Sequence, residues 1–565
     1  MRFFIAMVLL LSVLTSKAQV LKRIDLSDNN QITNFVSNTG EKIPAPAGLP
    51  LLSFRVNGEL RSTTQGNSQI NVSVSSIESD SYKATVLVTN TSRDTVRLSN
   101  IVPFGEKPDH VYLTGLGDHP LSRAHLFLPK KIPVNVILPD NAWELGYSSL
   151  NLSGVSVGAL MRRDVPSIKK GIRRRFETVL YPGGSVAYTL YVSYYQGDWQ
   201  NGMRYFFQSK KLFDLESFDS TLYQRKDLKW IRHSYVMHLV MAWDKNFYDG
   251  NKYTLPDFVK RGKRLYGGDD IVGIWPTWPT LGLDQRNQFD MFGDLPGGIS
   301  ALKALADTLR SHGTKFFICY NPWDESTRKE GHLAGLADLV RQTSADGVVL
   351  DTRGESSREL QEAADNVRKG VIMYSEGMAV PRNMPGIVSG RVHNALYYPP
   401  MLNLNKLIKP DFAIFRVAEV YKEPIKREFA LAFFNGYGTE INQFAAGHPA
   451  YEEVQYRFLG KTTRILRENT TNFTSSDFTP LITIDRDSVW VNKFSTSERD
   501  IYTIFSRVSE GVSQPLLKVS TDTSFHYVDL WNHEELTPTV LKGKSYVTVS
   551  AHAFDKTELG TNNEG

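Results

Sequence analysis

After about Trp230, short apolar runs alternate with amphipathic stretches of about 10 to 15 residues, and this rhythm constrains the fold more than any other feature. It predicts strands joined by helices, and therefore a parallel sheet. Seven such strands are visible, at residues 238–243, 271–275, 315–320, 347–350, 371–374, 412–415 and 439–443. With a long helix at 451–468, they favour a closed (β/α)₈ barrel with one strand unplaced. A doubly wound sheet is the rival fold, but no glycine-rich phosphate loop follows the first strand.

Both flanks of this region follow the two-residue period of β-strands. Residues 82–88 and 185–192 alternate in and out, with turn residues such as Pro182-Gly183-Gly184 between strands, and β patterning returns at 489–491 and 527–531. A chain of 565 residues is too long for a single core. We therefore predict a multidomain α/β plus β protein. Its parts are a signal peptide (1–18), an N-terminal β-sandwich (19–227), a central (β/α)₈ TIM barrel (228–476) and a small C-terminal β-sandwich (477–560).

The N-terminus has the features of an export signal. Met1-Arg2 is followed by an apolar stretch, and Ser16-Lys17-Ala18 offers small residues for cleavage after Ala18. The apolar stretch is too short to span a membrane. We expect a periplasmic or secreted protein. The single cysteine, Cys319, excludes a disulfide framework and a cysteine metal site.

Composition describes an ordinary soluble protein, with 41% hydrophobic and 22% charged residues. The net charge of +5 is spread along the chain, and the one dense basic run, 169–175, lacks interleaved aromatics. We interpret this run as a solvated loop or edge strand and expect no nucleic-acid partner. The 11% aromatic content suits carbohydrate binding as well as sandwich cores. We predict no cofactor, and the sequence does not give the oligomeric state.

Polar and aromatic residues follow almost every predicted barrel strand, at the end where barrel enzymes place their active sites. An acid after a strand is more often a helix cap, but seven strand ends in register are hard to explain as caps. Carboxylates to cleave the bond, amides to bind hydroxyls and Trp to stack on sugars are the inventory of glycosidic cleavage. The predicted substrate-binding residues are Trp243, Asp244, Trp275, Arg286, Asp290, Asn321, Trp323, Arg353, Arg416 and Glu419.

Asp351 is the predicted catalytic nucleophile. It ends 347–350, a strand without a polar residue, so its carboxylate is expected to be held rigidly at the rim. The alternative, that it caps the next helix, is weakened because Ser356 and Ser357 stand closer to the start of that helix.

The proton donor has two candidates. Glu376 follows another apolar strand, between Ser375 and Gly377, which leave room for a ligand. Glu419 lies near Arg416 on what we take to be the sixth strand, and a glutamate paired with arginine has a lowered pKa and is a poor acid. A general acid needs a raised pKa, which favours Glu376, while Glu419 is left to bind substrate hydroxyls.

Several segments resemble the α-galactosidase-like barrel glycosidases of clan D and their relatives. Residues 290–298 and 313–316 are similar to the clan's segment before strand three, 345–351 to its nucleophile segment, and 527–532 to its small β-domain. The resemblance implies a retaining mechanism on α-linked sugars with Asp351 as nucleophile. In clan D the acid/base is an aspartate after strand six, near the spacing of Glu419. In the α-amylase-like and endo-α-N-acetylgalactosaminidase-like families it is a glutamate after strand five, which Glu376 matches.

The sequence thus predicts a secreted glycoside hydrolase that cleaves α-linked glycans, with Asp351 as nucleophile and Glu376 as acid/base. The alternative is a non-catalytic barrel that binds glycans without cleaving them. A lyase or a metal-assisted hydrolase is a third possibility. The strand ends are not rich in histidine, which argues against a transition-metal site, so we predict no metal, although carboxylates are able to hold calcium.

Overall fold

The computed structural model divides the chain into two compact units, residues 1–114 with 143–202 and residues 115–142 with 203–565. The predicted signal peptide lies outside the described residues. The structure describes residues 20–555 except 78, 115–123, 139–144, 176, 209–217, 277–285, 323–330, 378, 380, 382, 393–399, 421–423 and 444–447.

The first unit is built of antiparallel strands, as predicted for the N-terminal region. Its larger sheet runs in the order β9-β12-β13-β14-β8-β4-β5, with β7 paired to β14 and β6 paired to β7. A three-stranded sheet, β1-β2-β3, packs against it over a core that contains Phe35, Val86 and Leu190. The strands are β1 (Leu21–Leu26), β2 (Ile32–Ser37), β3 (Lys42–Pro44), β4 (Leu52–Val56), β5 (Glu59–Ser62), β6 (Ile70–Ile77), β7 (Tyr82–Asn90), β8 (Val96–Pro103), β9 (Val111–Thr114), β12 (Leu145–Leu152), β13 (Val155–Arg173) and β14 (Glu177–Tyr195).

The tripeptide Pro182-Gly183-Gly184, expected as a turn between strands, lies inside β14. Pairing with β13 continues on both sides of it, since Lys169 pairs with Ser185 and Gly171 with Leu180. The register shifts there, and Gly183 has a φ of +71°, so the tripeptide forms an irregularity within one long strand. Beyond Arg162 the described partner of β13 is β14 alone, so the basic run begins on a sheet edge, in agreement with the sequence interpretation.

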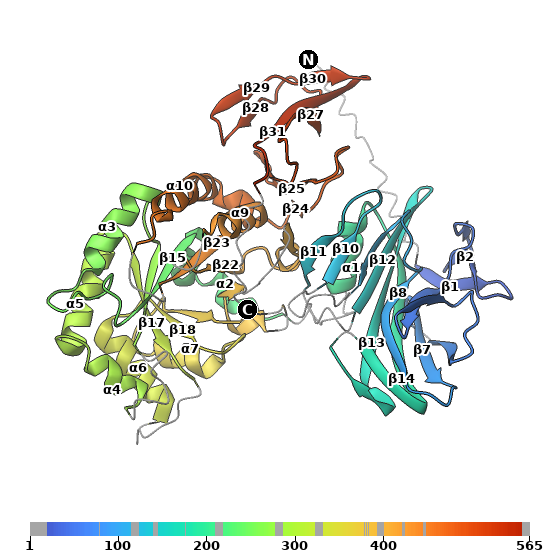
Figure 1. The fold of residues 1–565 in the computed structure, drawn as a ribbon, viewed down its shortest axis with the longest axis horizontal. Coiled ribbons are helices and arrows are strands. Elements are labelled where there is room, and N and C mark those ends of the chain that lie inside the picture. The colour runs from blue at the N-terminus through green and yellow to red at the C-terminus, as the bar shows by residue number, and fades with distance from the viewer. Residues whose placement is uncertain are drawn as a thin grey trace, which may run out of the picture. The chain divides into compact units, whose positions relative to one another are not determined.

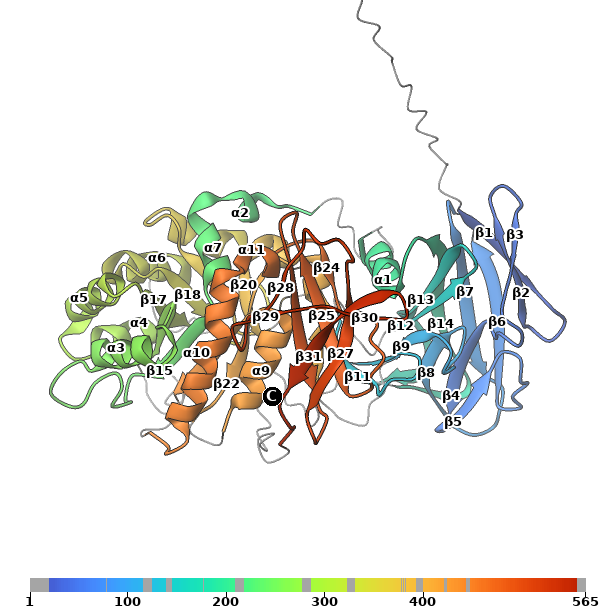
Figure 2. The same ribbon diagram turned by 90° about the horizontal axis from the view of Figure 1, so that it is seen from above.

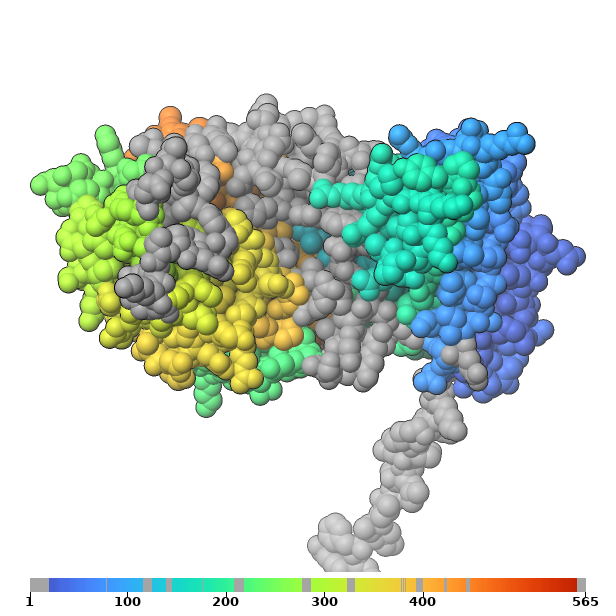
Figure 3. Space-filling model, turned by 90° about the horizontal axis from the view of Figure 1, so that it is seen from below, coloured from blue at the N-terminus to red at the C-terminus, as the bar shows by residue number. Residues whose placement is uncertain are grey.

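The second unit contains the predicted barrel. Eight parallel strands close in the order β15-β16-β17-β18-β19-β20-β22-β23, and β23 pairs with β15. Figures 1 and 2 show helices α3, α5 and α6 on the outside of these strands, and the green-to-yellow segment forms a continuous surface in Figure 3. The strands are β15 (Val236–Met241), β16 (Ile271–Trp275), β17 (Lys315–Tyr320), β18 (Gly347–Leu350), β19 (Ile372–Ser375), β20 (Ser389–Val392), β22 (Ala413–Ala418) and β23 (Gly438–Gln443).

The strand that the sequence did not place is β20, which becomes the sixth strand of the barrel. The strand that ends near Glu419 is β22, so it is the seventh strand and not the sixth as the sequence suggested. The helices of this unit are α2 (Thr221–Gln224), η3 (Lys226–His233), α3 (Leu255–Tyr266), α4 (Gln288–Gly293), α5 (Gly298–Ser311), α6 (Gly331–Thr343), α7 (Arg358–Asp365), η4 (Met384–Gly386), α8 (Asn405–Ile408), α9 (Lys426–Asn435), α10 (Glu452–Glu468) and α11 (Thr470–Phe473). Helix α1 (Trp199–Gln208) follows β14.

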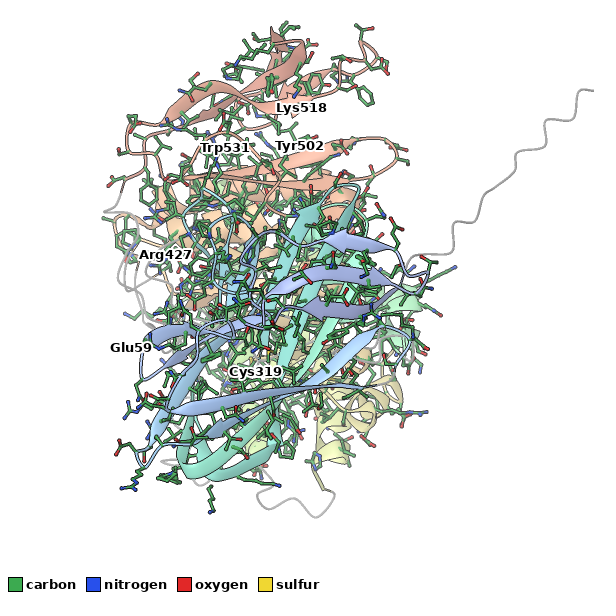
Figure 4. The ribbon with its side chains drawn as sticks, turned by 90° about the vertical axis from the view of Figure 1, so that its right-hand side faces the viewer. Glu59, Cys319, Arg427, Tyr502, Lys518 and Trp531 are labelled. Carbon is green, nitrogen blue, oxygen red and sulfur yellow. The ribbon has the colours of Figure 1, made fainter. Side chains whose placement is uncertain are left out.

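Small antiparallel sheets follow the barrel, as predicted for the C-terminal region. A core of valines, including Val491 and Val549, is buried there. Trp531, labelled in Figure 4, packs its ring against Phe433 of α9 and Phe458 of α10. The strands are β24 (Phe478–Thr479), β25 (Val489–Ser495), β26 (Asp500–Ser506), β27 (Val512–Val519), β28 (Tyr527–Asp529), β29 (Glu534–Leu536), β30 (Thr539–Leu541) and β31 (Lys544–Ala551). Strands β10 (Ala124–Phe127), β11 (Val134–Ile137) and β21 (Met401–Asn403) pair in that order within the second unit.

Within the described part of the chain, every helix is too short or too polar to cross a lipid bilayer.

Candidate functional site

The direction of each barrel side chain follows from two contacts. His238 of β15 bonds to Asp269 and to Tyr456 of α10, so His238 points outward to the helices. The Tyr374 hydroxyl of β19 donates to Glu440 of β23 at 2.5 Å, across strands that are not neighbours, so both point into the barrel. Side chains alternate along a strand, and laterally paired residues share a face.

By this alternation, six residues at the carboxyl ends of the strands point inward. Glu376 follows inward Tyr374 by two positions, and Asp351 lies beside Glu376 because Leu350 pairs with Ser375. The same argument places Glu419, since Val417 pairs with Glu440. The inward set is Trp275, Asn321, Asp351, Glu376, Glu419 and Asn442. The structure therefore brings five of the predicted site residues, and Asn442, to one end of the barrel.

Asp351 lies at the end of β18 and is 6% exposed. Its N–H donates to the carbonyl of Tyr320 at 2.9 Å, which continues the pairing with β17 by one residue. Its carboxylate lies near Cys319, which is labelled in Figure 4. Burial raises the pKa of the Cys319 thiol, and the negative charges of Glu440 and Asp351 raise it further.

Glu376 is held by donors on both carboxylate oxygens. The Arg391 guanidinium of β20 pairs with Oε1, and the peptide N–H of Thr352, the residue after Asp351, donates to Oε2. The backbones are also tied, because Glu376 N–H donates to Leu350 O at 3.2 Å and Gly377 N–H to Arg353 O at 2.8 Å. The carboxylate of Glu376 is therefore fixed directly beside the residue that follows Asp351.

This pairing reverses the premise on which Glu376 was preferred. The described ion pair of Arg416 is with Glu428 of α9, whereas Glu376 is itself paired with an arginine. An adjacent guanidinium favours the charged carboxylate. The preference for Glu376 over Glu419 therefore rests on position: Glu376 ends the strand next to that of Asp351, and Glu419 ends the seventh strand.

Asp244 and two tryptophans lie at the first two strands. Asp244 is 1% exposed and accepts from Asn246 N–H at 2.6 Å. Burial raises the pKa of the Asp244 carboxyl, opposed in part by Asn246 and His448. Trp243 beside it is 45% exposed, and Trp275 is buried at the end of β16. An exposed ring beside a buried acid suits stacking and hydrogen bonding to a sugar.

Asn321, after β17, is oriented by a residue that the sequence did not single out. The buried Gln288 of α4 accepts from Asn321 N–H at 2.8 Å and donates to Asn321 O at 2.9 Å. Both ends of the Gln288 amide are thus used to hold the backbone of Asn321. A glutamine at the start of a helix gave no sequence signal of this role.

Four predicted binding residues are not among the inward-pointing residues at the strand ends. Arg416 takes the helix-facing position between inward Phe415 and Val417, and donates to Glu428 at 3.3 Å, so it is not at the rim. Arg286 forms an exposed ion pair with Asp294 at 2.7 Å. Asp290 is exposed in the first turn of α4, and Arg353 is exposed in the loop after β18. Trp323 lies outside the described residues.

Arg391 is the charged residue that sequence reasoning missed, because its strand was not recognised. It is almost fully buried and also donates to Glu440 Oε1 at 2.6 Å. The sixth strand is followed in sequence by His393-Asn394-Ala395, so no aspartate stands where clan D has its acid/base. In the described residues, no group of three or more His, Cys, Asp or Glu is arranged to hold a metal ion.

No family model and no curated protein sequence matches the chain. Among solved structures it is similar to the α-N-acetylgalactosaminidase of Bifidobacterium bifidum in complex with GalNAc, at 12% identity, 86% and 99% coverage of this chain and of that one, and a TM-score of 0.43. It is also similar to the GH36 α-galactosidase of Geobacillus stearothermophilus, with 10% identity, coverage of 91% of this chain and 86% of that one, and a TM-score of 0.43. A cyclomaltodextrinase has 11% identity, coverage of 82% of this chain and 96% of that one, and a TM-score of 0.43. Because these scores are below 0.5, the fold assignment rests on the strand pairing itself.

Proposed function

We propose that the chain is a glycoside hydrolase that cleaves α-linked glycans with retention of configuration. The observation that carries the proposal is the placement of two carboxylates, Asp351 and Glu376, at adjacent inward positions on β18 and β19. Neighbouring strands lie about 4.8 Å apart, which suits the separation of about 5 to 5.5 Å between the carboxyl groups of retaining enzymes.

Asp351 attacks the anomeric carbon, and the C–O bond to the leaving group breaks as a glycosyl-enzyme ester forms. Glu376 gives its proton to the departing oxygen. It then takes a proton from water, whose oxygen attacks the anomeric carbon and releases Asp351. Asn321, Asp244 and Trp243 bind the sugar. Support for this assignment is the buried position of Asp351, whose N–H donates to Tyr320 O, and the hydrogen-bonded position of Glu376 beside it.

The test is turnover of a panel of aryl α-glycosides and natural α-linked glycans. Asp351→Ala is expected to lower kcat by about 10³-fold or more, because the covalent route is lost. The matched control is Asp257→Ala, which removes an acid that is 63% exposed on α3 and is expected to keep wild-type turnover. Undiminished hydrolysis by folded Asp351→Ala would falsify the assignment of the nucleophile.

Glu376→Ala tests the acid/base role separately. It is expected to lose about 10² to 10⁴-fold on substrates with poor leaving groups and much less on dinitrophenyl glycosides, which need no proton. Azide is expected to rescue its turnover with formation of an α-glycosyl azide, whereas the Asp351→Ala variant is expected to give the β-azide. Equal losses for good and poor leaving groups would instead assign the acid role to another residue, with Glu419→Gln as the next variant.

A non-catalytic glycan-binding barrel is the second candidate, and the pairing of Glu376 with Arg391 favours it, since this pairing stabilises the carboxylate. It predicts saturable binding of α-linked glycans by calorimetry with no release of sugar. The two candidates are separated by following both binding and product in the same incubation.

Export to the periplasm or the exterior is part of the proposal and rests on the signal-peptide pattern of residues 1–18. The mature protein is expected to begin at Gln19. N-terminal sequencing of the protein recovered from its native host tests this, and retention of Met1 would contradict it.

A further inference from the structure

A hydrogen-bonded network of charged side chains links Glu376 to the interior of the barrel. Arg391 of β20 pairs with Glu376 Oε1 through one terminal nitrogen, and its Nε donates to the Glu376 carbonyl at 3.1 Å. Its other terminal nitrogen donates to Glu440 Oε1 at 2.6 Å. A single guanidinium is thus shared by two carboxylates.

Glu440 is the buried carboxylate at the other end of this network. Its side chain has no exposed surface, and its second oxygen accepts from Tyr374 at 2.5 Å. Burial raises the pKa of the Tyr374 hydroxyl well above its usual value, and the negative charge of Glu440 raises it further, so the hydroxyl remains a donor. Each carboxylate oxygen of Glu440 therefore accepts one hydrogen bond, from Arg391 and from Tyr374 respectively.

We propose that Arg391 is a positioning residue shared by Glu376 and Glu440, and that Glu440 offsets its charge so that Glu376 is able to take up a proton. The inference rests on the acid/base role proposed for Glu376. Without Glu440, the guanidinium charge would act on Glu376 alone, and Glu376 would stay ionised where a general acid must be protonated. In this scheme neither residue touches the substrate: Arg391 contacts the carboxylate of Glu376, and Glu440 acts on Glu376 only through Arg391.

The backbone N–H that donates to Oε2 of Glu376 is oriented by an uncommon backbone conformation. Thr352 has a φ of +58°, in the left-handed region that a β-branched residue rarely adopts, and its N–H points to Glu376.

The described charged and titratable groups around Glu376 are Arg391 on β20, Glu440 on β23, Tyr374 on β19, Cys319 on β17, and Asp351 and Arg353 after β18.

The test is Glu440→Gln in the full-length protein, a change that keeps the shape of the side chain and removes its charge. The pKa of Glu376 is read by a ¹³C NMR titration of labelled glutamate carboxyl carbons, assigned with Glu376→Gln. We expect it to fall by about one unit or more. The alkaline limb of the pH profile of kcat/KM is expected to move to lower pH by the same amount, with kcat at the new optimum kept within about threefold.

The matched control is Glu428→Gln, which removes a buried carboxylate paired with an arginine on the helix side of β22. It is expected to lower stability and to leave the titration of Glu376 and the pH profile unchanged. A purely structural role for Glu440 would make the two variants alike, and a Glu376 titration that is unchanged or shifted upward in Glu440→Gln overturns the inference.

The double variant Arg391→Met/Glu440→Gln removes the charges together, which buried ion pairs often tolerate. Because the guanidinium contacts Glu376 directly, its loss outweighs that of Glu440, and the pKa of Glu376 is expected to rise above the wild-type value. Absence of this rise overturns the inference even where Glu440→Gln alone fails to fold.

Failure of the inference is distinguishable from failure of the proposed function. The NMR titration needs no substrate, so it reports on Arg391 and Glu440 even if the protein cleaves no glycan. Conversely, full hydrolysis by Glu376→Ala on poor leaving groups would remove the acid/base role while leaving the charge sharing to be judged by the titration.

Discussion

Replacing Lys406 by methionine is expected to remove a pH dependence of the free energy of unfolding. Lys406, on α8, is 4% exposed, and its Nζ donates to Phe473 O at 2.6 Å and Pro410 O at 3.0 Å. Burial lowers the pKa of the Lys406 ammonium to about 7, and the charge of Asp411 opposes this only in part.

The sign follows from proton binding. Above about pH 7 the folded protein releases the Lys406 proton, while the unfolded chain keeps it up to about pH 10.4, so unfolding takes up a proton and stability rises with pH. Integrated from pH 7 to 9, this amounts to about 2 kcal/mol. The stability of Lys406→Met minus that of wild type is therefore expected to be about 2 kcal/mol greater at pH 7 than at pH 9.

Urea unfolding at pH 7, 8 and 9 measures this difference. The loss of the two Lys406 hydrogen bonds lowers the stability of the variant by the same amount at each pH, so it does not affect the change of the difference with pH. The control is Lys303→Met, at an exposed position on α5, for which the difference is expected to be constant. A constant difference for Lys406→Met as well would contradict this prediction, because it would mean that Lys406 keeps its proton in the folded state.

Two further predictions concern the backbone of the barrel. Thr352→Asn is expected to raise the free energy of unfolding by about 0.5 to 1 kcal/mol, since asparagine adopts a φ of +58° more readily; urea midpoints test it, and a destabilised variant would contradict it. Gly347→Ala is expected to cost about 1 to 3 kcal/mol because its Cβ would collide with the Phe317 ring inside the barrel, whereas Gly66→Ala, with open space around it, is expected to change little. Equal stability of these two alanine variants would contradict the packing argument.

The parts of the fold that sequence predicts well are those whose burial is apolar. Strands β16, β17 and β18 were placed at their observed bounds because each is a run of buried apolar residues, preceded in β17 by Lys315 alone. Strand β20 is Ser-Gly-Arg-Val, and its inward positions carry Ser389 and Arg391. A pattern that searches for apolar runs does not find a strand whose inner face is polar.

The missing strand also explains why the sequence left two candidates for the proton donor. The position of Asp351 at a strand end was predicted because its own strand is apolar, and the structure places it there. The partner depends on strand count, and with β20 absent, Glu419 was assigned to strand six instead of strand seven. Arg391, which fixes Glu376, was lost with the same strand. Strand parity alone distinguishes Glu419 from Arg416, since the two residues point to opposite faces of the barrel wall.

The one thiol of the chain sits inside the closed barrel, at Cys319, with no exposed surface. A thiol reagent reaches it only when the barrel wall opens, and no second cysteine competes for the label. The rate of thiol modification of the unmutated protein therefore reports the rate or extent of barrel opening. A glycan that binds at the rim of the closed barrel is expected to lower the rate of Cys319 labelling. Ligands are then detectable by this effect even when they are not cleaved.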